Sequence, residues 1–65
     1  MELFVNGESL KTECSNLEQL ISSLGFSPDS VVAEVNLKIV KKENLAGTRL
    51  KEGDRIELVN FVGGG

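Results

Sequence analysis

The chain opens with Met1-Glu2-Leu3-Phe4-Val5-Asn6-Gly7, a stretch that combines a strand pattern with a hairpin turn. Its first, third and fifth residues are apolar and would share one face of a strand, while Phe4 points the other way. Asn6-Gly7 favours a type I′ turn, because both residues tolerate positive φ angles. Residues 8–13 would return as a second, more polar strand with Leu10 facing inward. The sequence therefore predicts an N-terminal hairpin.

A short helix is predicted after the hairpin. Apolar residues recur at i, i+3, i+4 and i+7 and define one helix face: Leu17, Leu20, Ile21 and Leu24. Ser15 and Glu18 have the spacing of a capping box at its start, and Gly25 would end it. We expect the helix over residues 16–24, about 14 Å long, which suits a rod lying across a small sheet.

Three further strands are predicted, over residues 31–35, 37–40 and 55–62. Leu45 and Leu50 stand alone between them and would hold that segment against the core. The last strand is expected to pair with the first, because short, right-handed connections then join all the elements. The predicted fold class is α+β, with a mixed four- to five-stranded sheet and one helix packed on one face. The predicted core comprises Met1, Leu3, Val5, Leu17, Leu20, Ile21, Leu24, Val35, Ile56 and Leu58.

Composition narrows the possible functions. A chain of 65 residues forms one small domain, which has too little core to enclose a substrate. It lacks His, the commonest general base and metal ligand. A single cysteine, Cys14, cannot form an internal disulfide or a cysteine-based zinc site, and we expect it to be a small half-buried residue. We therefore expect no metal and no catalytic residues.

Charge and apolar runs indicate where the chain would act. The net charge of −3 argues against nucleic acid or an anionic membrane as a partner. No apolar run approaches the length of a membrane span, and the start has no signal-peptide pattern. A small domain without disulfides is typical of a reducing compartment, so the expected location is cytoplasmic.

The other end of the sequence, Asn60-Phe61-Val62-Gly63-Gly64-Gly65, runs from a strand pattern into three glycines. We expect residues 1–62 to form the domain and residues 63–65 a flexible tail that presents the α-carboxylate of Gly65. At about 3.3–3.6 Å per residue, the glycines would reach about 10 Å beyond Val62. Glycines have no side chains to block a narrow channel.

One helix can cover only one face of the sheet, so the other face is open to solvent or to a partner. We predict that it is a partner-docking face, since contiguous exposed apolar residues tend to mark interfaces. Its predicted residues are Phe4, Val59, Phe61 and Val62.

Taken together, these features resemble the ubiquitin-like β-grasp family, and within it the thiamine-biosynthesis sulfur carriers. The resemblance covers the whole chain: a length near 65, the opening strand with Asn6-Gly7, the helix around Leu17-Glu18-Gln19-Leu20-Ile21, the Val35-Asn36 turn, the segment Ile39-Val40-Lys41-Lys42-Glu43, the turn Glu52-Gly53-Asp54, and a last strand running into glycines. Gly64-Gly65 after such a pattern is the most specific of them. The family more commonly shows two terminal glycines, so Gly63 would only lengthen the tail.

The resemblance implies a carrier and not an enzyme. A ubiquitin-activating-enzyme-like adenylyltransferase (ThiF-like) would use ATP to adenylate the Gly65 carboxylate. A cysteine-derived persulfide would then displace AMP and leave a thiocarboxylate. Thiazole synthase (ThiG-like) would take that sulfur into the thiazole ring. The carrier itself would bind no cofactor.

Three alternatives remain open at the level of sequence. The chain would also fit the small subunit of molybdopterin synthase, although those chains tend to be longer. A ubiquitin-like modifier that forms isopeptide bonds would share the fold and the tail. A non-covalent β-grasp interaction domain would share the fold alone.

Overall fold

The first two strands form the expected hairpin in the computed structural model, which describes residues 1–61. Strand β1 spans Glu2–Val5 and β2 spans Glu8–Lys11. They pair antiparallel, and the turn between them has positive φ at both Asn6 (51°) and Gly7 (83°). This geometry confirms the predicted type I′ turn.

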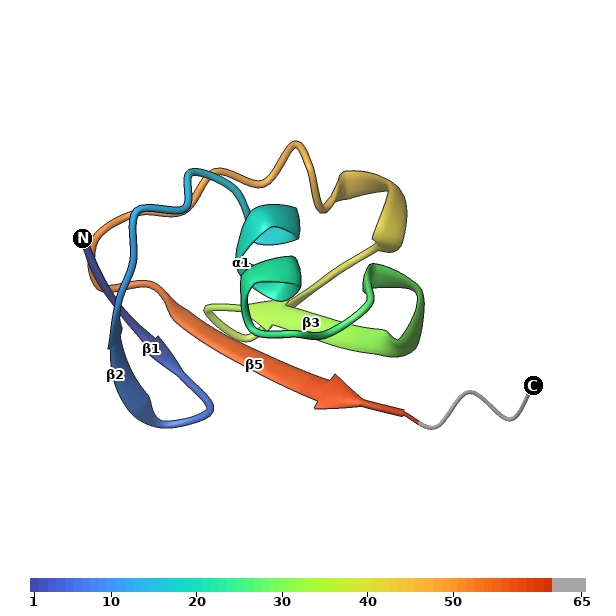
Figure 1. The fold of residues 1–65 in the computed structure, drawn as a ribbon, viewed down its shortest axis with the longest axis horizontal. Coiled ribbons are helices and arrows are strands. Elements are labelled where there is room, and N and C mark those ends of the chain that lie inside the picture. The colour runs from blue at the N-terminus through green and yellow to red at the C-terminus, as the bar shows by residue number, and fades with distance from the viewer. Residues whose placement is uncertain (62–65) are drawn as a thin grey trace.

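Five strands of the described chain join in one mixed sheet, in the order β2-β1-β5-β3-β4. Strands β3 (Val31–Val35), β4 (Lys38–Val40) and β5 (Arg55–Asn60) form its second half. β5 runs parallel to β1, which confirms the predicted pairing of the last strand with the first. It also pairs antiparallel with β3, so the last strand lies in the middle of the sheet. It crosses the molecule from the N-terminal end to the opposite end (Figure 1).

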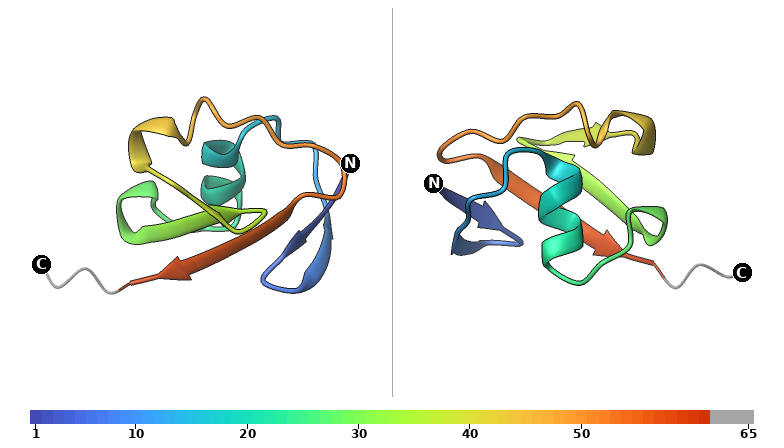
Figure 2. Two further views of the ribbon diagram at one scale, coloured as in Figure 1. Left: turned by 180° about the vertical axis from the view of Figure 1, so that it is seen from behind. Right: turned by 45° about the horizontal axis from the view of Figure 1, so that its top comes forward.

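A single α-helix of the described residues, α1 (Leu17–Ser23), lies across one face of the sheet (Figure 2). Its apolar stripe is fully buried at Leu17, Leu20 and Ile21. The predicted α+β arrangement, with one helix on one sheet face, is confirmed. No helix within residues 1–61 is both long enough and apolar enough to span a membrane.

The helix begins one residue later than the capping prediction. Asn16 is the N-cap, and its Oδ1 accepts a hydrogen bond from the Gln19 N–H at 2.8 Å. The Gln19 side chain accepts in turn from the backbone N–H of Ser15 at 2.9 Å. The predicted Ser15–Glu18 box is wrong because the Glu18 N–H donates instead to the Leu45 carbonyl at 3.3 Å. A distant segment therefore decides which of two adjacent capping residues is used.

The helix ends as predicted at Gly25, whose φ is +87°. The Phe26 N–H donates to the Ile21 carbonyl at 3.1 Å, which closes a Schellman motif. Leu24 is the C-cap and is 36% exposed, so its place in the predicted core is wrong. Met1 is also wrongly placed in the core, because it precedes β1 at the sheet end and is 41% exposed.

The core lies between α1 and the facing side of β1, β5 and β3. Its buried apolar residues are Leu3, Leu17, Leu20, Ile21, Val31, Ala33, Leu45, Leu50, Ile56 and Leu58. Leu45 and Leu50 hold the segment between β4 and β5 against the core, as expected. Val5 and Val35 are only partly buried but pack against it.

A buried polar contact fixes the start of β5. Asp54 is 8% exposed, and its carboxylate accepts from the Asn36 side-chain amide at 3.0 Å and from the Lys51 N–H at 2.8 Å. The Asn36 carbonyl oxygen accepts from the Arg55 N–H at 3.0 Å. The turn between β3 and β4 is thereby tied to the first residue of β5.

Candidate functional site

The strand that leads toward the glycines is also the centre of the open sheet face. Along β5, exposed Glu57 and Val59 alternate with buried Ile56 and Leu58. The Phe61 N–H donates to the Ser30 carbonyl at 2.9 Å, so the pairing of β5 with the β3 side continues one residue beyond the strand. The predictions for Val62 and for Gly63, Gly64 and Gly65 concern residues outside the described part.

Exposed apolar side chains gather at the end of the sheet where β5 finishes. Val59 is 62% exposed and lies directly opposite Val32, which is 42% exposed. Phe61 is 43% exposed, and Ile39 on β4 is 69% exposed, one diagonal step from Val32. We call these four residues (Val32, Ile39, Val59 and Phe61) the outer-face patch.

Phe4 lies apart from this patch. It is half-buried and pairs with Arg55 at the start of β5, and the Arg55 guanidinium lies 5.6 Å from the centre of its ring. Arg55 precedes Val59 by four residues, which is about 13 Å along a strand. Of the predicted docking residues, Phe4, Val59 and Phe61 therefore share one face but do not form one contiguous cluster.

Two carboxylates separate Phe4 from the outer-face patch. Glu34 on β3 and Glu57 on β5 are direct cross-strand partners. The one ion pair among residues 1–61 lies elsewhere, between Lys42 and Asp29. The open face thus presents negative charge beside an apolar surface, which suits a partner that carries both apolar and basic side chains.

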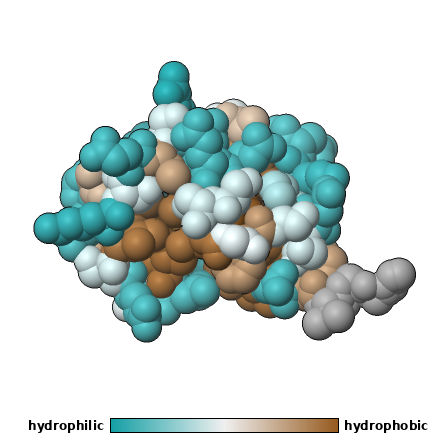
Figure 3. Space-filling model, viewed as in Figure 1, coloured by the Kyte–Doolittle hydropathy of each residue, from teal (hydrophilic) through white to brown (hydrophobic). Residues whose placement is uncertain are grey.

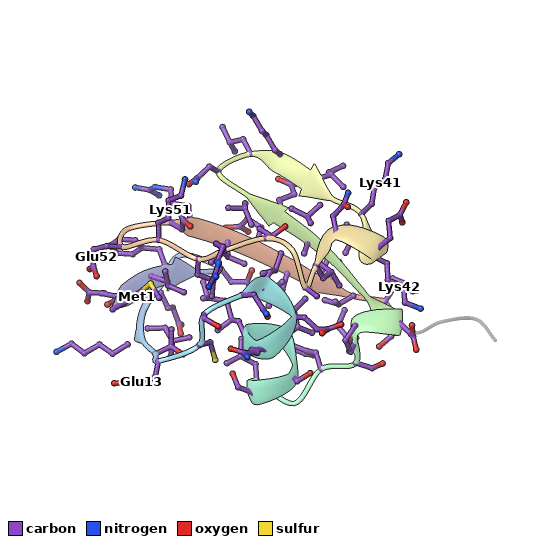
Figure 4. All side chains as sticks on the ribbon, turned by 90° about the horizontal axis from the view of Figure 1, so that it is seen from above. Met1, Glu13, Lys41, Lys42, Lys51 and Glu52 are labelled. Atoms are coloured by element: carbon purple, nitrogen blue, oxygen red, sulfur yellow. The ribbon has the colours of Figure 1, made fainter. Side chains whose placement is uncertain are left out.

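Two lysines lie at the same end of the molecule as the last residues of β5 (Figure 4). Asp29 accepts a hydrogen bond from Lys42, and this bond and the carboxylate charge raise the pKa of the Lys42 ammonium above its ordinary value of 10.5. Lys41 is exposed beside it.

The cysteine and the acidic residues form no second site among the described residues. Cys14 is half-buried as expected, with its Sγ 3.7 Å from the Ser23 Oγ. Residues 1–61 contain no cluster of three or more His, Cys, Asp or Glu placed to hold a metal ion.

The open face also holds four residues that are absent from the predicted docking set: Val32, Glu34, Ile39 and Glu57. Alternation within the predicted strands places Val32 and Glu34 opposite to the inward residues of β3, so that signal was present in the sequence. The pairing of Glu34 with Glu57 depends on register between distant strands, which the pattern of one strand does not carry.

Comparison with known proteins connects this fold and face to a family. The sequence model of the ThiS family matches residues 2–65. The chain belongs to the ThiS family. The match agrees with the expected resemblance to the sulfur carriers of the ubiquitin-like β-grasp family.

Two relatives support the ThiS assignment over all or nearly all of their length. The sulfur carrier protein ThiS of Bacillus subtilis is 34% identical over 65 residues, which are 97% of this chain and 98% of the relative. The crystal structure of the thiamine biosynthesis protein ThiS from Geobacter metallireducens superposes with a TM-score of 0.82 and 32% identity, over 100% of both chains. The ubiquitin-like β-grasp fold is therefore confirmed.

A third relative of this ThiS-family chain is a larger protein. The thiazole synthase of Magnetococcus marinus is 39% identical over 66 residues, which cover 100% of this chain and 20% of the synthase. A second thiazole synthase, from Paramagnetospirillum magneticum, matches over the same share of its length. The chain thus spans about a fifth of each thiazole synthase that it resembles.

Proposed function

We propose that this chain carries sulfur for thiazole formation in thiamine biosynthesis, as a thiocarboxylate on Gly65. Membership of the ThiS family, through a match that extends to residue 65, is the observation that carries the proposal. The name of the Bacillus subtilis relative, a sulfur carrier protein, supports the same role. The proposed site of action is the cytoplasm.

The chemistry requires activation of a poor acylating group. A ThiF-like adenylyltransferase binds the carrier and ATP, and the Gly65 carboxylate attacks the α-phosphate with loss of pyrophosphate. A cysteine-derived persulfide then attacks the acyl carbon and AMP leaves. A thiol cleaves the resulting S–S bond and releases the thiocarboxylate. The carrier supplies the reacting terminus and a docking surface, while the acids, bases and ATP site belong to its partner.

We propose the outer-face patch as the surface that the adenylyltransferase holds. Its exposed residue Val59 lies on β5, and exposed Phe61 follows that strand by one residue, shortly before the glycines in the sequence. A partner that binds this patch would hold Phe61 four residues before Gly65, a separation that a fully extended chain spans in at most about 14 Å. Short reach matters because an acyl adenylate forms only when the carboxylate is placed in line with the α-phosphate.

Thiazole synthase is the proposed sulfur acceptor. Two proteins named thiazole synthase contain a region similar to the whole of this chain. A carrier-like region within a synthase supports the idea that carrier and synthase act on the same sulfur. The separate chain would then dock on a ThiG-like synthase after it has been loaded.

Growth of a bacterium tests the acceptor. A strain that lacks its own thiamine sulfur carrier but keeps its adenylyltransferase and thiazole synthase should grow without thiazole when it expresses this chain. A matched chain without Gly64 and Gly65 should not restore growth, although it should accumulate to the same level. Rescue of a strain that lacks the molybdopterin-synthase small subunit, with no rescue of the thiazole requirement, would assign the sulfur to molybdopterin instead.

A further inference from the structure

A second apolar surface lies on the other side of the sheet, between the hairpin and the end of the helix. It is a groove of about 410 Å³ with apolar lining from Val5, Leu10, Leu24 and Phe26, and Glu8 is one of its polar lining residues. The space-filling view shows hydrophobic side chains gathered in this hollow (Figure 3). The groove is separate from the outer-face patch, because it lies on the helix side of the sheet.

The groove adjoins a free sheet edge. β2 is the outermost strand on this side of the sheet. The Thr12 N–H donates to the Met1 carbonyl at 2.9 Å, so Thr12 and Met1 form a hydrogen-bonded pair. Such pairs alternate with non-hydrogen-bonded pairs along an antiparallel ladder, so the backbone N–H and C=O groups of Leu10 and Glu8 point toward β1. The backbone N–H and C=O groups of Ser9 and Lys11 therefore point away from the sheet, where an added strand would meet them.

We propose that β2 and this groove bind an extended peptide segment of a partner protein, which adds antiparallel to β2 as a sixth strand. Backbone groups of the segment would pair with Ser9 and Lys11, as in other cases of strand addition. Side chains two residues apart on the segment would face Leu10 and Glu8. The residue opposite Leu10 enters the apolar groove between Leu24 and Phe26.

The negative charge of Glu8 specifies which side chain the segment would carry opposite that residue. Glu8 is exposed, and the one ion pair among residues 1–61 does not involve it. A lysine or arginine opposite Glu8 would form a cross-strand pair of opposite charge. In an antiparallel segment the residue opposite Leu10 precedes the residue opposite Glu8 by two. The site therefore takes the pattern apolar–any–basic, and this inference does not depend on the proposed sulfur chemistry.

The test measures binding of a fluorescein-labelled peptide, Thr-Thr-Ile-Thr-Lys-Thr, to the full chain at physiological salt. We expect saturable binding, with NMR shifts at the amides of Ser9 and Lys11. Methylation of the peptide nitrogen of the threonine between Ile and Lys should abolish binding, because that N–H points toward β2. Methylation of the Ile nitrogen, which points away, should leave the Kd nearly unchanged.

A charge exchange provides the matched control. Glu8→Lys should weaken binding of the lysine peptide on the order of tenfold and should favour the same peptide with Glu in place of Lys. Glu57→Lys makes the same charge change on the other face and should leave the Kd unchanged. Leu24→Lys should remove binding while the fold is kept, since a cation near a helix C-terminus is tolerated.

Several results would overturn the proposal. These are absence of saturable binding to the unmodified chain, equal effects of Glu8→Lys and Glu57→Lys, and equal effects of the two methylations. A dimer of the chain that Leu24→Lys dissociates would assign the groove to a second copy instead.

Discussion

Glu34 and Glu57 lie directly opposite each other on adjacent antiparallel strands, in the middle of the open sheet face. Like charges in this position repel, so the pair lowers the stability of the free domain. Their neighbours along the strands are Val32 and Val59, which belong to the outer-face patch. The face that we propose for docking therefore carries an electrostatic cost that a basic group of a partner would relieve.

Glu57→Lys should replace this repulsion by attraction and raise the free energy of unfolding by up to about 1 kcal/mol. Urea unfolding followed by circular dichroism measures the change. The same substitution should weaken binding to the adenylyltransferase, so stability and binding move in opposite directions. Glu8→Lys, which has no carboxylate opposite it, serves as the control and should leave stability nearly unchanged. A loss of stability in Glu57→Lys would show that the two carboxylates do not repel.

Two leucines of the same helix should differ widely in their effect on stability. Leu20 is fully buried, whereas Leu24 is 36% exposed. Leu20→Ala should lower the free energy of unfolding by about 2–5 kcal/mol, because it leaves a cavity in the core. Leu24→Ala should cost clearly less, since its site is already open to solvent. Equal costs in urea unfolding would mean that the helix is packed differently.

Asp54→Ala should destabilise the domain although it removes a charge from an acidic chain. The carboxylate accepts from the Asn36 amide and the Lys51 N–H, and its loss leaves these donors without their acceptor. We expect a cost of about 1–3 kcal/mol by urea unfolding. Asp29→Ala removes an exposed carboxylate paired with Lys42 and should cost little. An Asp54→Ala protein as stable as Asp29→Ala would argue that water replaces the lost contacts.

Replacement of Phe61 by Asp should weaken binding of the adenylyltransferase and leave unfolding nearly unchanged. Val59→Asp should have the same effect, because both side chains are exposed on the outer-face patch. Phe4→Asp should affect binding less and stability more, since Phe4 is half-buried beside Arg55. Calorimetric titration separates the three variants. If Phe4→Asp proved the most harmful to binding, the docking centre would lie at the start of β5.

The elements of the fold followed from local patterns in the sequence. Alternation and Asn6-Gly7 predicted the hairpin, the spacing of Leu17, Leu20 and Ile21 predicted the buried helix face, and connection rules predicted β5 beside β1. The predictions that proved wrong concern features that depend on contacts between residues far apart in the sequence. Asn16 and Ser15 are both good caps, and the Leu45 carbonyl, which binds the Glu18 N–H, favours Asn16.

The candidate site was predictable in part. Alternation placed Val59 and Phe61 on the open face, and their exposure agrees with that placement. Alternation could not show that Phe4 lies apart from Val59 and Phe61. Periodicity gives the face on which a side chain lies, but not where one strand sits along a distant strand. The groove was missed for a related reason: periodicity assigns Leu24 to the core, whereas Leu24 is 36% exposed and lines the groove together with residues of the hairpin.

The most direct test of the carrier function is the intact mass of the chain after incubation with ATP, a ThiF-like adenylyltransferase and a persulfide donor. We expect a gain equal to the mass difference between sulfur and oxygen, located on Gly65. Removal of Gly64 and Gly65, or extension of the chain beyond Gly65, should abolish the gain without lowering the unfolding temperature. Deletion of Gly63 alone should reduce it less, since the Gly-Gly end survives. Full thiocarboxylate formation on an extended chain, with no trimming back to Gly65, would show that the Gly65 carboxylate does not carry the sulfur.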